Sequence, residues 1–296
     1  MTTIVSRHDV TSPVYAAHAE RFPAERSRQV ARLEKTAKSA PSVLSSIYVD
    51  ARISLVLDPE AVQLQTWQAW VVSMQVAHAL FAVSTASKGT DVECVIDQKP
   101  RHLTATGPRY YTNASNWTQA FFLAVTCRED RRWRELCQIP VDLLREAGQS
   151  KGTRYNPYTY HWVAALQAFM TNRPGLVDEL TAAMEMSDPR QVEFGDPEAL
   201  NKLVFPQMEA FLKFAQGDPA GFNESLANGL RLFRDYHTTN EERAQNIDGT
   251  VPLGLLALAC MAYDRSFHEP AFRLEVESDY LPKHIVERSW YGEFPT

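Results

Sequence analysis

The stretch "AFMTNRPGLVDELTAAM", residues 168–184, decides the fold of this 296-residue chain. Its apolar residues stop at the sequence Asn172-Arg173-Pro174-Gly175 and resume directly afterwards. Because Asn, Pro and Gly interrupt helices, these four residues predict a tight turn. The stretch therefore predicts a helical hairpin, in which two antiparallel helices flank a short turn.

A second hairpin follows about 45 residues later, in "AFLKFAQGDPAGFNESLANGL", residues 210–230. When Pro174 is aligned with Pro219, and one inserted residue is allowed, the apolar residues of 165–184 and 210–230 coincide. The coincident pairs are Ala165 and Ala210, Leu166 and Phe211, Phe169 and Phe214, Leu176 and Phe222, Leu180 and Leu226, and Met184 and Leu230. A third copy is "FFLAVTCREDRRWRELC", residues 121–137. This period is typical of helical solenoids, although the tetratricopeptide consensus is absent. We predict an all-α array of antiparallel helical hairpins, similar in architecture to a solenoid of tetratricopeptide repeats.

Four helix starts share an Asp or Asn directly before a Pro, a pair that caps a first helical turn. They are Asp58-Pro59, Asn156-Pro157, Asp196-Pro197 and Asp218-Pro219. With apolar periodicity, these starts predict helices over 14–38 (broken near Pro23), 42–57, 59–86, 113–127, 129–147, 157–171, 174–187, 197–216, 219–236, 250–264 and 281–289.

One β-hairpin insertion is expected at about 91–105, where Val92, Cys94 and Ile96 alternate before a turn at Lys99-Pro100. A second extended piece is expected at 272–278. No Pro-, Gly- or Ser-rich linker divides the chain, so we expect a single helical domain over residues 1–296.

The net charge of −6 disfavours a nucleic-acid partner. Residues 175–248 hold 14 acidic and 6 basic residues, a net charge of −8 that leaves +2 for the remainder. Such an acidic half suits a basic protein partner, although a solvated helix face explains it as well. The start of the chain lacks a signal peptide, and its longest apolar stretches fall short of the roughly 20 residues of a membrane span. We therefore expect a cytoplasmic protein without a membrane partner.

No pattern in the sequence supports chemistry. His161 is expected on an apolar helical face without a nucleophile, which is typical of a core histidine. His284 and Glu287 share one helical face but lack further metal ligands. Phosphate-binding and nucleophile-elbow motifs are missing. We predict no catalytic residue, no metal ligand and no cofactor.

Candidate partner-binding residues come from the acidic half and from the ending "SWYGEFPT". Tyr and Trp are common interface anchors, but burial of the ending against its own chain is the favoured interpretation. The candidates are Glu241, Glu242, Asp248, Trp290, Tyr291, Glu293 and Phe294.

Several strings resemble the immunity protein 49 family of actinobacterial polymorphic toxin systems. They include "TATGPRYYTNASNWTQAFFLAVTCRED", "YHWVAALQAF" and the ending "VESDYLPKHIVERSWYGEFPT". The resemblance runs from about residue 20 to the last residue, and the ending is its most specific part. It implies a cytoplasmic, mainly helical protein, encoded beside a secreted toxin, which protects the producing cell by binding that toxin. It implies no catalytic residues.

The predicted function is stoichiometric occlusion of a cognate, basic toxin. Two alternatives stay open, namely a helical-repeat adaptor for another cytoplasmic protein and an enzyme that reverses the toxin's modification through His161 or His284. The toxin, the face that binds it and the oligomeric state are not determined by the sequence.

Overall fold

The computed structural model describes residues 2–10 and 12–294. These residues form two compact units. The N-terminal unit holds residues 12–154 and 290–294, and the C-terminal unit holds Tyr155–Ser289 with the described residues up to Val10. Both are helical, and strands in the described parts of the chain form two short pairs, so the all-α class with one small β-hairpin is confirmed. One domain over 1–296 stays a prediction.

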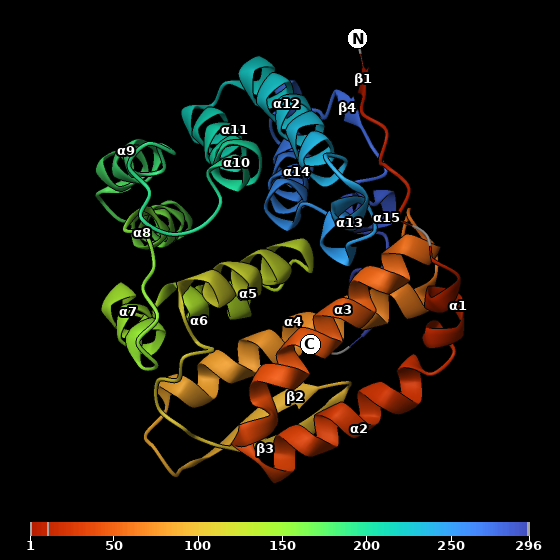
Figure 1. Ribbon diagram of the computed structural model, residues 1–296, viewed down its shortest axis with the longest axis vertical. Helices are drawn as coiled ribbons and strands as arrows, with labels where there is room; N and C mark the ends of the chain where they lie inside the picture. Colours follow the sequence, from red (N-terminus) through yellow and green to blue (C-terminus); the bar gives the residue numbers. More distant parts are fainter. Residues whose placement is uncertain (1, 11, 295–296) are drawn as a thin grey trace. The chain divides into compact units, whose positions relative to one another are not determined.

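The N-terminal unit is built around α4, which is buried on every side rather than along one stripe. Trp70 of α4 donates its indole N–H to Thr126 Oγ1 of α5 at 2.9 Å in the interior. Helices α3 and α5 both pack on α4 (Figure 1). The elements of this unit are α1 (Pro13–Ala19), α2 (Phe22–Lys35), α3 (Ala40–Leu57), α4 (Leu64–Thr85), β2 (Asp91–Ile96), β3 (Lys99–Thr104), α5 (Ala114–Thr126), α6 (Asp130–Cys137) and α7 (Val141–Gln149).

The predicted β-hairpin is present as the antiparallel pair β2 and β3, but the predicted turn is wrong. The chain turns at Asp97 and Gln98, whose φ values of 52° and 63° make the mirror-image turn that suits strand twist. Lys99 and Pro100 lie within β3, paired with Ile96 and Val95.

His78 ties α4 to α6 and shows why a histidine can occupy an apolar helix. The Arg132 Nη1 group can only donate, so His78 Nδ1, 3.1 Å away, accepts. His78 Nε2 must then carry the proton that it donates to Glu135, 2.8 Å away. Burial lowers the pKa of His78, which agrees with this neutral tautomer.

The C-terminal unit contains the two hairpins from which the fold was predicted, α8 with α9 and α11 with α12 (Figure 1). Its elements are β1 (Thr3–Ile4), α8 (Tyr158–Thr171), α9 (Leu176–Met186), α10 (Pro197–Ala199), a π-helical turn (Leu200–Val204), α11 (Phe205–Gln216), α12 (Pro219–His237), α13 (Glu241–Ala244), α14 (Leu253–Ser266), β4 (Val276–Glu277) and α15 (Lys283–Val286).

Both hairpin turns use left-handed backbone, as the turn residues require. Asn172 and Gly175 have φ values of 51° and 97°, and Gly217 has 71°. The hairpins meet through aromatic rings, because Phe169 of α8 contacts Phe211 and Phe214 of α11 edge to face. Phe169 and Phe214, which coincide between the repeats, are thus in direct contact.

Two helix predictions and one predicted helix cap are wrong for local reasons. The helix expected over 129–147 breaks before Pro140, which has no N–H and disfavours helical backbone in the preceding residue. The helix expected from 59 begins at Leu64, because the Asp58 carboxylate binds the N–H groups of a loop instead. Asn156 caps no helix; its side chain holds the backbone of Phe194. Asp196 and Asp218 do cap α10 and α12.

The second extended piece is confirmed as β4, which pairs in parallel with β1, a strand that was not predicted. Two helical segments, Ala37–Leu57 and Ile247–Ser266, are long and apolar enough to cross a membrane, so the expectation that none reaches this length is wrong. About two thirds of each apolar window is buried inside the protein (61% and 67%), as in ordinary core helices.

Candidate protein-binding site

The acidic candidates lie on and beside α13, a four-residue helix that sequence periodicity did not predict. Asn240 begins it, since its side-chain oxygen accepts the Arg243 N–H at 2.9 Å. Glu241 and Glu242 fill the first turn, where acidic side chains suit the helix dipole. Both are exposed, and neither pairs with a cation among the described residues. Asp248 is exposed in the following turn.

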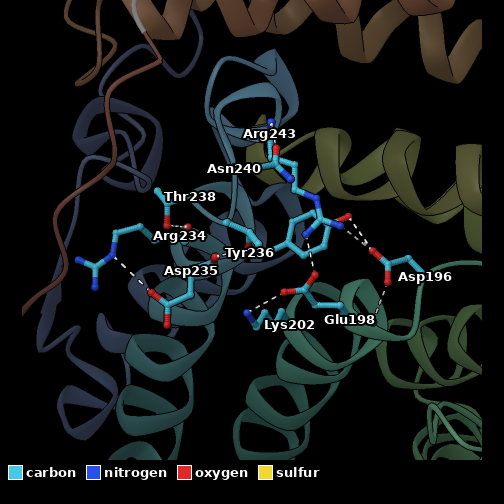
Figure 2. Close-up of polar contacts among 10 residues, drawn as sticks. Asp196, Glu198, Lys202, Arg234, Asp235, Tyr236, Thr238, Asn240 and Arg243 are labelled. Carbon is cyan, nitrogen blue, oxygen red and sulfur yellow. Dashed lines mark hydrogen bonds and ion pairs between the residues drawn. The ribbon is translucent and has the colours of Figure 1, made fainter.

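Arg243 fastens α13 to the beginning of α10. Its guanidinium lies 2.6 Å from Glu198 Oε2 and 3.0 Å from Asp196 Oδ2, and it covers the Tyr236 ring of α12 at 4.0 Å. Figure 2 shows Arg243 between the Tyr236 ring and the two carboxylates. One side chain therefore connects three segments through ion pairs and a cation–π contact.

Glu198 is held from a second side by Lys202, whose ammonium lies 2.9 Å from Oε1 (Figure 2). Hydrogen bonds from Arg243 and then Lys202 lower the pKa of Glu198. The hydrogen bond to Glu198 is in turn the main cause of a raised pKa for Arg243. Asp196 and Glu198 are thus paired with cations within the chain, while Glu241 and Glu242 face solvent.

Packed rings, of which His237 and Tyr280 are buried and His8 is half-buried, support the α13 segment within the C-terminal unit. His8 and His237 stack with ring centres 6.0 Å apart, and His8 Nδ1 lies 2.6 Å from the Tyr280 hydroxyl. Burial, followed by the nearby His8, lowers the pKa of His237 to about 4. A Cβ on Gly249 would lie 2.8 Å from His8 Cε1, so any larger residue in the following turn would force the His8 ring to shift.

The aromatic ending lies in the N-terminal unit and is divided between burial and exposure. Trp290 is half-buried and donates its indole N–H to the Ala61 carbonyl at 2.9 Å. Phe294 is also half-buried, whereas Glu293 is exposed and the Tyr291 side chain is 53% exposed. The seven predicted residues therefore form two groups, one on each unit.

Sequence reasoning missed Arg243, Asp196, Glu198 and Tyr236. Arg243 lies 45 and 47 positions from its two acidic partners, and no local pattern signals such a pairing. The π-helical turn after α10 is a feature often found at functional sites, and it has no clear sequence signature either.

The two histidines considered for chemistry have structural contacts. His161 is half-exposed rather than a core residue, and its Nδ1 lies 2.7 Å from Glu179 across the hairpin of α8 and α9. His284 Nδ1 lies 2.9 Å from the Ser289 hydroxyl. Within residues 2–10 and 12–294, no three His, Cys, Asp or Glu side chains gather as a metal site would require.

Comparison with known proteins gives one match. The family model described as immunity protein 49 matches residues 58–285, which is more than half of the chain. The match is shorter at both ends than the resemblance seen in the sequence, and the aromatic ending lies outside it. No curated protein matches the chain. No solved structure matches it either.

Proposed function

Because the chain belongs to the immunity protein 49 family, we propose that it binds a cognate toxin and neutralises it in the cytoplasm of the cell that makes both. Inhibition is by stoichiometric occlusion of the toxin's active site or substrate surface, without turnover. The family match carries this proposal. A helical-hairpin array supports it, since such arrays offer wide surfaces for protein partners.

The acidic surface on α13, made of Glu241 and Glu242 with Asp248 in the next turn, is the proposed contact for a basic toxin. Arg243 supports this assignment, because it holds α13 in place without being available to neutralise the outward carboxylates. A held surface loses less conformational entropy on binding than a mobile one. Attraction between this acidic surface and a basic toxin would speed their association. The bound surface would then cover the positive charge with which the toxin binds its substrate.

The experiment is co-expression with the neighbouring toxin-like gene in a toxin-sensitive host, followed by co-purification from the survivors. Rescue together with a stable one-to-one complex supports the proposal. Rescue without a complex favours an enzyme that reverses the toxin's modification. Absence of rescue, with both proteins expressed, would contradict an immunity function for this toxin and favour the adaptor alternative.

A further inference from the structure

The loop between α3 and α4 is held rigidly by a buried carboxylate. Asp58 accepts the backbone N–H groups of Val62 at 3.0 Å and of Gln63 at 2.8 Å. Ala61 has a left-handed φ of 55° and is completely buried. Non-glycine residues adopt this conformation only where the surroundings enforce it. The loop therefore displays the neighbouring Val62 outward in a fixed position.

The aromatic ending is fastened to this loop. The Trp290 N–H donates to the Ala61 carbonyl at 2.9 Å, between residues 229 positions apart. Tyr291 is the next residue of the chain, and its side chain is exposed. The hydrogen bond thus brings the ending and the loop together within the N-terminal unit.

Four of the ten large apolar side chains that are exposed among the described residues belong to these two short segments. Val62 is 51% exposed, Tyr291 53%, Leu57 43% and Leu64 37%. We call these four side chains, with Glu60 and Glu293, the loop–tail surface. Apolar side chains that gather at a surface mark interaction sites, whereas isolated ones need no explanation. A rigid display lowers the entropy lost on binding.

Charge decides between possible occupants. Glu60 and Glu293 are both exposed, one on each segment, and neither pairs with a cation among the described residues. Residues 57–64 and 290–294 contain no Lys or Arg. A second copy of the chain across a twofold axis would bring this acidic rim against itself. A partner that surrounds an apolar centre with cations would complement the rim.

We propose that the loop–tail surface is a docking site for the toxin, which presents an aliphatic or aromatic centre flanked by Lys or Arg. This inference rests on the proposed function. It assigns apolar anchoring to Val62 and Tyr291, while Trp290 acts as a positioning residue that holds the tail on the loop.

The test uses Val62→Asp and Tyr291→Ala in the full chain, with Val177→Asp as the matched control. Val177 is an exposed residue of α9, 74% accessible, and belongs to the C-terminal unit. The affinity of each protein for the purified product of the neighbouring toxin-like gene is measured by calorimetry, and folding is checked by thermal unfolding. We expect both loop–tail variants to bind about tenfold more weakly or worse, and the control to bind as the wild type does.

The outcomes separate the two proposals. If the wild type binds the toxin and both loop–tail variants bind it equally well, the docking site is wrong while the proposed function stands. If the wild type itself does not bind, the proposed function fails and the docking site with it. A wild-type dimer that Val62→Asp converts to a monomer would assign the surface to a second copy and overturn the inference. Tyr291→Ala decides the matter if Val62→Asp unfolds.

Discussion

Arg243 and Glu198 meet at 2.6 Å although 45 positions separate them, and this ion pair fixes a four-residue helix that could not be stable alone. The pair joins α13 to α10, and the Tyr236 ring supports the guanidinium from the other side. The orientation of Glu241 and Glu242 therefore depends on a contact made elsewhere in the C-terminal unit.

Replacing Arg243 with Ala should loosen α13 without unfolding the unit. The variant loses both ion pairs and the cation–π contact, so backbone amides of residues 240–246 should exchange with solvent faster, on the order of tenfold. Hydrogen exchange read by mass spectrometry measures this. Arg131→Ala is the control, because Arg131 is a highly exposed arginine that pairs with Glu135 of its own helix. Equal exchange in both variants would show that Arg243 does not fix the segment.

Reversing the charge of Glu241 and Glu242 to Lys should weaken toxin binding, chiefly by slowing association. The loss should be greatest at low salt, because exposed charges are screened as ionic strength rises. Association rates measured at two salt concentrations test this, with the exposed α7 pair Asp142→Lys and Glu146→Lys as the control. An unchanged affinity at low salt would remove the acidic surface from the interface.

The hairpins could be predicted because their signals are local. Pro174 lies in a turn and Pro219 begins the second helix of its hairpin, and the apolar spacing on either side follows from helix geometry alone. The Arg243 cluster and the Trp290–Ala61 hydrogen bond could not be predicted, since each joins residues far apart in the chain. Asp58 could not be predicted for another reason. A carboxylate before a proline can either cap a helix or accept hydrogen bonds from a loop, and tertiary packing selects between the two.

The stability of the C-terminal unit should fall as the pH drops from about 6.5 to 4. Burial lowers the pKa of His237 to about 4 and lowers that of His8, so the unfolded chain binds these protons first. The contribution of the neutral histidines to the free energy of unfolding is complete above pH 6.5. It is lost on acidification, by up to about 2 kcal/mol for His237. Urea unfolding at pH 7, 5.5 and 4.5 measures it. A His237→Gln variant should show a flatter pH dependence, and identical slopes would refute the assignment.

Asp50 should act in the opposite direction in the N-terminal unit. Its carboxyl is buried, and burial raises its pKa to about 6 despite His18, 3.6 Å away. As the pH falls, the folded chain therefore binds a proton at Asp50 before the unfolded chain does. Above pH 6 the buried carboxylate is charged, and this lowers the free energy of unfolding. Asp50→Asn should raise the melting temperature at pH 7 by a few degrees, from about 1 kcal/mol. At pH 4 the gain should vanish, and a lower melting temperature at pH 7 would show that the ion pair with His18 dominates.

The measurement that tests occlusion most directly is the remaining activity of the purified toxin as increasing amounts of this protein are added. Stoichiometric inhibition predicts a linear fall that ends at one protein molecule per toxin molecule, with no recovery of toxin activity over time. Complete protection at a small fraction of one equivalent would indicate turnover and would contradict the account.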